Sequence, residues 1–191
     1  AVELFVPNAD AVPEARLAVR QVSHLVASPL DPNVDQPKAA GSCNVDVACY
    51  QSTWSNASAT VARIVFTENG STYVCTGTLM NDKDTATYIP YFLTANHCIS
   101  SPGVAATMNS YWFYEASTCG GGLRNWQQLT AGATLLASSA STDFSFLRLR
   151  EPAPAGAWFA GWTTANPTGA PATAIHHPAG GSKKISFGTV Q

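Results

Sequence analysis

From residue 41 onward the chain is a series of short, β-prone runs separated by turn sequences. The expected strands are the runs 61–66, 73–80, 88–95, 104–115, 129–138 and 144–149. The gaps between them combine Asn, Asp, Gly and Pro, as in 68–70, 81–84, 101–103 and 119–122. This pattern predicts an all-β domain of six strands, closed into an antiparallel barrel because closure leaves no strand edge exposed. Gly77 inside the run 73–80 predicts a bulge or a close backbone approach.

Two segments flank this predicted barrel. The proline-rich stretch 151–156 is typical of a linker, and the runs 158–162, 172–177 and 183–188 after it are expected to be further strands. A sheet of only these strands would leave an edge unpaired and four aromatic side chains without cover. These are Trp158, Phe159, Trp162 and Phe187. The expected division is therefore an N-terminal extension (1–40), a first barrel (41–150) and an unfinished second unit (151–191).

The N-terminal extension differs in composition from the rest of the chain. It holds several prolines, a stretch (14–26) that fits either a short helix or an extended segment, and His24, expected at the surface. We weigh two interpretations: a retained part of a pro-segment that packs against the barrel, and a surface extension without a role. The chain starts at Ala1 and shows no signal peptide, as expected of a processed, exported product or a trimmed chain.

Composition excludes some classes of function. The 191 residues suffice for one or two domains with a sizeable core. Charged residues make up 12% of the chain and the net charge is −2, so no basic surface for nucleic acid is expected. No apolar run is long enough for a membrane-spanning helix. We therefore expect neither nucleic acid nor membrane as a partner.

Two polar residues follow or precede apolar runs in a way that suggests proton transfer. His97 ends the run 91–98, where a buried strand would bring its imidazole to the edge of a sheet. Asp143 begins the run 143–149, 46 residues later. A carboxylate beside an imidazole fixes the tautomer and stabilises the imidazolium. The alternatives are a core histidine bonded to a carbonyl and an aspartate that only starts a strand.

The cysteines indicate disulfides. Five are spread along the chain without a Cys-x-x-Cys motif, which favours an oxidising compartment over a metal site. Because the number is odd, one is left over if all pairing is internal. That one either pairs outside this chain or is a free thiol that behaves as a small hydrophobic side chain.

A set of colinear segments identifies a family resemblance. They are GSCNVDV (41–47), CTGTL (75–79), YFLTANHC (91–98), YWFYE (111–115), STC (117–119), GATL (132–135), DF (143–144), AGW (160–162) and AIHHP (174–178). In them the chain resembles the chymotrypsin-fold serine endopeptidases and, more narrowly, the secreted bacterial lysyl endopeptidases. The first forty residues lie outside the resemblance.

The resemblance implies a double β-barrel, with the first barrel complete and the second only begun. It implies that His97 is the general base and Asp143 its orienting acid, with no cofactor and no metal. It further implies disulfides Cys49–Cys119 and Cys75–Cys98, with the partner of Cys43 outside this chain. The expected location is extracellular or periplasmic.

The nucleophile of such an enzyme is not found in this sequence. The family carries it in a Gly-x-Ser-Gly loop of the second barrel, and Ser141, Ser145 and Ser182 do not stand in that context. We therefore expect the N-terminal chain of a serine endopeptidase, inactive alone, with a C-terminal segment or chain that supplies the serine. Its substrates would be proteins or peptides, cleaved after lysine by the closer resemblance.

Two other functions remain open at the level of the sequence. A protease-like module without activity would serve binding or structure, although the intact pair of His97 and Asp143 favours the enzyme. A metalloenzyme would use His97, His176 and His177. Adjacent histidines on a strand point to opposite faces, so a structural role is favoured for His176 and His177.

Overall fold

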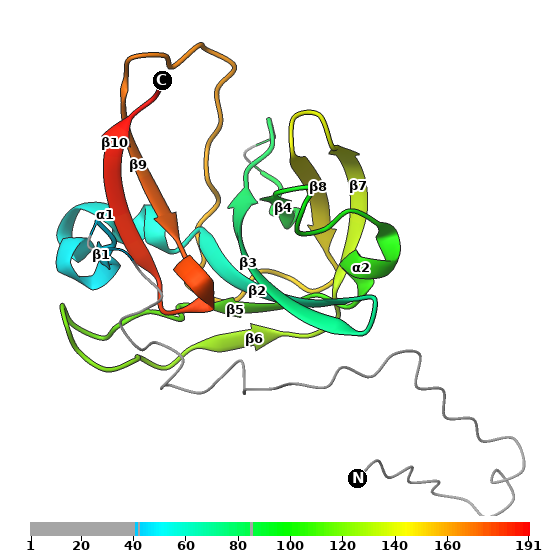
Figure 1. The fold of residues 1–191 in the computed structure, drawn as a ribbon, viewed down its shortest axis with the longest axis horizontal. Helices are drawn as coiled ribbons and strands as arrows, with labels where there is room; N and C mark the ends of the chain where they lie inside the picture. Colours follow the sequence, from blue (N-terminus) through cyan, green and yellow to red (C-terminus); the bar gives the residue numbers. More distant parts are fainter. Residues whose placement is uncertain (1–40, 42, 85) are drawn as a thin grey trace, which may run out of the picture.

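The computed structural model describes residues 41, 43–84 and 86–191 (Figure 1). The expectations for residues 1–40, including His24, lie outside the described residues. Two antiparallel sheets dominate the fold, so the prediction of a strand-rich structure is confirmed. The elements of the larger sheet are β2 (Val61–Glu68), β3 (Ser71–Met80), β4 (Tyr91–Thr94), β5 (Asn109–Trp112), β6 (Gln127–Leu129), β7 (Ala133–Ser139) and β8 (Phe144–Leu149). The smaller sheet contains β1 (Val45–Asp46), β9 (Pro171–His176) and β10 (Lys184–Thr189).

The larger sheet is strongly curled. Its strands pair in the order β6-β5-β2-β3-β4-β8-β7, and no ladder between described strands joins β6 to β7. Yet β6 ends at Leu129 and β7 begins at Ala133. That short connection keeps the ends of the two edge strands within about 15 Å of each other. The sheet therefore has seven strands instead of the six expected, rolled so that its edges approach at this corner.

The corner explains why the run 129–138 is two strands and not one. Gly132 has φ +75°, a conformation that favours glycine. A Cβ atom there would lie 2.5 Å from the carbonyl oxygen of Ala106. The backbone turns sharply at this glycine and passes from one edge of the sheet to the other, so the prediction of one continuous strand is wrong.

Helical structure replaces the beginning of one expected strand and also occurs where no element was expected. The run 104–115 begins as α2 (Pro102–Ala106), because Ser101 caps this turn by accepting the Val104 N–H at 3.3 Å and Pro102 fits its first position. The strand β5 covers only the middle of that run. Residues before β2 form a 3₁₀ turn (Val47–Tyr50) and α1 (Gln51–Ser58), which the sequence did not indicate.

The core lies inside the curled sheet. Large, fully buried side chains from five of its strands meet there, among them Ile64, Leu79, Phe92, Trp112 and Leu147. The rings of Phe92 and Trp112 pack edge to face, with centroids 6.0 Å apart. A Cβ atom on Gly77 would lie 2.1 Å from Phe92, so the predicted close approach at this glycine is confirmed.

The smaller sheet stands beside the larger one, with β10 between β1 and β9 (Figure 1). The predicted strands 172–177 and 183–188 are present as β9 and β10. Residues 158–162 form no strand, since they cross the end of β3 and make only a bridge between Ala160 and Met80. Trp158, Trp162 and Phe187 are each at least 52% exposed, whereas Phe159 packs against the core.

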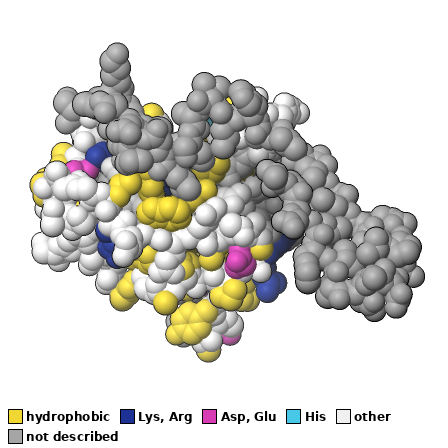
Figure 2. Space-filling view, turned by 90° about the horizontal axis from the view of Figure 1, so that it is seen from below, with side chains coloured by type: hydrophobic (Ala, Val, Ile, Leu, Met, Phe, Trp, Pro, Cys, Tyr) yellow, Lys and Arg dark blue, Asp and Glu magenta, His cyan; other side chains and the backbone are white. Residues whose placement is uncertain are grey.

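Few charges stand on the surface. The face seen in Figure 2 mixes hydrophobic and neutral polar side chains with scattered charged ones. In the part of the chain that the structure describes, no helix is long and apolar enough to cross a membrane.

Candidate active site

Strand pairing brings His97 and Asp143 together. His97 lies in the turn that follows β4, and Asp143 lies in the turn that precedes β8. These strands are antiparallel neighbours, with Thr94 opposite Ser145. The end of β4 and the start of β8 therefore meet at one edge of the sheet, although the two residues are 46 positions apart.

The carboxylate of Asp143 holds His97 at two points. Its Oδ2 lies 2.7 Å from Nδ1 of the imidazole, and its Oδ1 accepts the backbone N–H of His97 at 2.9 Å. A carboxylate only accepts, so Nδ1 carries the proton and Nε2 is left with its lone pair. Among the described residues, Nε2 has no hydrogen-bond partner. This tautomer is the one that can take a proton from a neighbouring hydroxyl.

The environment keeps Asp143 ionised. The backbone N–H of His97 and then its side chain stabilise the charged carboxylate, and they lower the pKa of Asp143. The side chains of His97 and Asp143 are 70% and 51% exposed, so the pair faces solvent. Asp143 has φ +49°, a left-handed conformation that aspartate tolerates better than most residues.

Neighbouring contacts fix the turn that carries His97. The disulfide Cys75–Cys98 ties the next residue to β3, and Thr94 donates to the Thr76 carbonyl at 2.8 Å. Ser145, buried on β8, donates to the Ile99 carbonyl at 2.6 Å. The turn is thus attached to both neighbours of β4.

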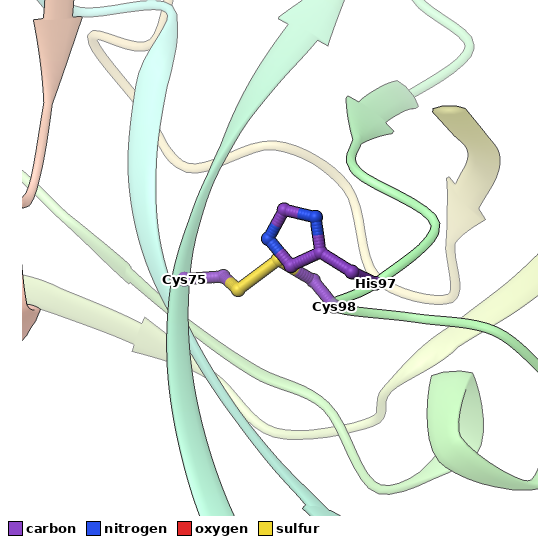
Figure 3. A group of neighbouring side chains, drawn as sticks. All are labelled: Cys75, His97 and Cys98. Carbon is purple, nitrogen blue, oxygen red and sulfur yellow. A yellow bond between two sulfur atoms is a disulfide. The ribbon is translucent and has the colours of Figure 1, made fainter. Parts of the chain in front are cut away.

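A metal site is not formed by the side chains around His97. Ligand atoms of Cys75, His97 and Cys98 lie within 4.8 Å of one another. Figure 3 shows that the two sulfur atoms are bonded to each other, whereas a cysteine binds zinc only as a free thiolate. In this oxidised state the group offers a single imidazole.

The disulfides implied by the resemblance are both present. Cys49–Cys119 closes a long loop, with a sequence separation of 70, and links the segment before α1 to the loop after β5. Cys75–Cys98 has a separation of 23. Cys43 is exposed and has no disulfide partner among the described residues.

The histidine pair at the end of β9 does not join His97 in one site. His177 is buried, its backbone N–H donates to Thr76 Oγ1 at 2.9 Å, and its Nδ1 lies 2.9 Å from the carbonyl oxygen of Gly181. Burial, and then the charge of Lys183, lower its pKa well below 6.5, so the imidazole is neutral. These contacts agree with the structural role favoured from the sequence.

A second polar cluster was missed in the sequence. Glu115, almost fully buried, accepts from Ser58 Oγ at 2.8 Å, lies 3.1 Å from Lys183 Nζ, and accepts from Arg124 Nη1 at 2.9 Å. Lys183 is 0% exposed and donates to the Ser58 carbonyl at 2.7 Å. The only sequence signal is a charge directly beside an apolar run, which does not reveal the partner.

The charges of Glu115 and Lys183 stabilise each other. Burial alone would raise the pKa of Glu115, but the charge of Lys183 and the hydrogen bond from Ser58 outweigh it, and the pKa is lowered. Burial lowers the pKa of Lys183, against the opposing attraction of Glu115. The cluster connects α1 and the end of β5 to the start of β10, and it touches neither His97 nor Asp143.

Comparisons with known proteins give a family model, a curated relative and a solved structure that match this chain. A family model described as the lysyl endopeptidase C-terminal domain matches residues 37–191. The lysyl endopeptidase of Pseudomonas aeruginosa is 37% identical over 201 aligned positions, which cover 99% of this chain and 43% of that protein. The chain thus spans less than half the length of this curated relative. Among solved structures, the protease Anisep from Arthrobacter nicotinovorans matches with a TM-score of 0.49 and 20% identity, over 76% of this chain and 66% of that one.

Proposed function

Because this chain belongs to the lysyl endopeptidase C-terminal domain family, we propose that it carries the general base of a secreted serine endopeptidase. In this proposal His97 is the base and Asp143 is the carboxylate that orients it. The observation that carries the proposal is the double contact of one carboxylate with the imidazole Nδ1 and the backbone N–H of His97, at 2.7 and 2.9 Å.

The chemistry follows from this tautomer. Nε2 of His97 takes the proton of a serine hydroxyl as the serine oxygen attacks the carbonyl carbon of a peptide bond. The imidazolium then gives that proton to the departing amine, and water repeats the sequence to release the acyl group. Asp143 stays ionised throughout and stabilises the imidazolium.

The proposal places the nucleophile outside residues 1–191, since no serine of this sequence stands in a Gly-x-Ser-Gly context. A further segment or a second chain would add strands beside β9, complete a second barrel, and bring the serine to His97. It would also supply a cysteine for Cys43.

Cleavage after lysine is proposed from the name of the relative. A digest of a peptide library by the whole protein tests this proposal. Cleavage after arginine as efficient as cleavage after lysine would contradict it.

Secretion is part of the proposal. Two disulfides form and persist in an oxidising compartment, either outside the cell or in the periplasm. A disulfide from Cys43 to a second polypeptide would appear as a mass shift between non-reducing and reducing analysis. A monodisperse species near 20.1 kDa with an alkylatable Cys43 would argue against that partner.

The test of the enzymatic function is labelling of the whole protein with a fluorophosphonate, which reacts with an activated serine. We expect one labelled polypeptide, and we expect His97→Ala to abolish rapid labelling. His176→Ala is the matched control and should label like the unmodified protein. A protein that is folded but never labelled would favour the alternative, a protease-like binding module.

A further inference from the structure

A hollow whose lining includes neither His97 nor Asp143 lies on another part of the molecule. It has a volume of about 460 Å³ and opens between α1, the loop that leads into β6, and the segment after β8. Its lining residues are Gln51, Ser55, Asn56, Ala59, Phe113, Glu115, Arg124, Asn125, Gln127, Ala155, Gly156 and Trp158. Sites for small ligands or for a few residues of peptide are typically about 300–1,000 Å³, so this hollow has the size of a binding site.

Five neutral polar side chains of this lining have unused hydrogen-bonding groups. They are Gln51, Ser55, Asn56, Asn125 and Gln127. Within the described residues, none of the five side chains makes a hydrogen bond to the protein. Four of them are amides, each with donors and an acceptor. Their convergence on one hollow suits a ligand with alternating N–H and C=O groups.

Arg124 adds a fixed positive charge. Its Nη1 donates to Glu115 at 2.9 Å, and its guanidinium lies over the ring of Phe113 at 5.2 Å. The side chain remains 44% exposed, so its other N–H groups face the hollow or solvent. Glu115 is also paired with Lys183, so one carboxylate stands between two cations. Arg124 and Glu115 are the charged residues of the lining, and Lys183 lies fully buried behind Glu115, so the three groups together carry one net positive charge.

Trp158 provides an apolar contact at the rim. It is 53% exposed, although its backbone N–H is held by the carbonyl of Ala59 at 3.2 Å. Tryptophan and arginine are the residue types that most often dominate the energy of protein–peptide contacts. A Trp ring and an anchored guanidinium beside unused amides thus form a ready contact surface for polypeptide.

We propose that this hollow binds an extended acidic peptide segment. A Glu or Asp carboxylate of the peptide pairs with Arg124, its backbone amides bond to the Asn and Gln side chains, and an apolar side chain covers Trp158. An oligosaccharide would also suit the amides and the ring. Two observations favour the acidic peptide. Glu115 is already paired with Arg124 and Lys183, so the lining has no free carboxylate to accept sugar hydroxyls, and the exposed part of the Arg124 guanidinium can still pair with a peptide carboxylate.

Fluorescence anisotropy of the full chain tests the proposal with a fluorescein-labelled peptide rich in Glu and Leu. A second probe has Gln in place of every Glu. We expect the acidic probe to bind at least about tenfold more tightly, since a hydrogen-bonded charge contact contributes that much. Its affinity should fall as salt is added. Binding requires no peptide cleavage, so this result does not depend on the proposed proteolytic function.

Two variants of the lining sharpen the test. Arg124→Gln should weaken binding of the acidic probe about tenfold, and Gln127→Glu should weaken it by charge repulsion while leaving the Arg124–Glu115 contact in place. Arg150→Gln, an exposed arginine outside the hollow, is the matched control and should bind like the unmodified chain. Equal affinity for both probes, no binding, unchanged affinity in Arg124→Gln and Gln127→Glu, or displacement of the probe by a neutral oligosaccharide would overturn the proposal.

Discussion

The buried lysine of the second polar cluster offers the sharpest test of how this fold is held together. Lys183 is 0% exposed and contacts the carboxylate of Glu115 at 3.1 Å and the carbonyl of Ser58 at 2.7 Å. Lys183→Met keeps most of the apolar stem but removes the charge and all three donors. Glu115 then stays buried with Ser58 and Arg124 only, and the Ser58 carbonyl loses its donor.

The expected loss of stability is large. Removing one partner of a buried ion pair costs about 3–5 kcal/mol when the other charge stays buried without compensation. Because Glu115 keeps its contact with Arg124, we expect the lower end of that range. Since domains of this kind unfold with a free energy of about 5–15 kcal/mol, Lys183→Met should remove about a fifth or more of the total. Lys184→Met is the matched control. Its partner Asp46 is less buried, so we expect a cost of about 1 kcal/mol.

The effect should depend on pH in a defined direction. The pKa of Glu115 is lowered in the folded protein, so its stabilising contribution is present above the ordinary value of 4.5 and is lost as pH falls through the folded value. In Lys183→Met the buried carboxylate loses its main attraction, and its pKa rises. The difference in the free energy of unfolding between Lys183→Met and the unmodified protein should therefore become smaller as the pH is lowered.

Urea unfolding followed by circular dichroism measures these differences at neutral and acidic pH. The double variant Lys183→Met/Glu115→Gln should recover part of the loss in the free energy of unfolding, because a neutral amide replaces a buried carboxylate that has lost one of its two cations. Two outcomes would refute the reasoning. One is a Lys183→Met protein as stable at neutral pH as the Lys184→Met control. The other is a double variant no more stable than the single one.

Three further predictions concern the site and the core. Asp143→Asn should lower turnover of the whole protein about ten-thousandfold, as loss of the orienting carboxylate does in serine triads, and near-normal turnover would contradict its role. Gly77→Ala should cost about 1–3 kcal/mol in urea unfolding, since its Cβ would overlap Phe92, whereas Gly188→Ala meets no atom and should be nearly neutral. Burial lowers the pKa of His177, so stability should fall as pH drops below 6.5 and His177→Asn should flatten that slope; equal slopes would count against it.

The meeting of the two candidate catalytic residues was within reach of the sequence. His97 closes one apolar run and Asp143 opens another, and antiparallel pairing of these runs places both at one edge. Their chemistry also made them natural partners. The sequence analysis did not predict that these two runs pair with each other. It suggested the partnership of His97 and Asp143 from their chemistry and from the family resemblance.

The helices and the buried cluster of Glu115 and Lys183 could not be predicted from the sequence. The α1 sequence QSTWSNAS contains mostly weak helix formers, so tertiary contacts, such as Trp54 with Phe187, must support it. Glu115 and Lys183 are 68 positions apart and lie on different sheets or their extensions. Only packing decides that these two charges turn inward and meet, and periodicity carries no information about that choice.

The His97–Asp143 pair is exposed, so the surrounding backbone and not the attraction between the two charges must fix its geometry. An ion pair that is 70% and 51% exposed gains little from its own charges, because water screens them. The orientation of the imidazole instead rests on constraints from both neighbouring strands. These are the Cys75–Cys98 bond on one side, and on the other the left-handed Asp143, which accepts the His97 backbone N–H. An imidazole held in this way is already oriented in the chain as described. If His97 is the base, as proposed, a segment that covers it would need only to exclude water and bring a serine within reach.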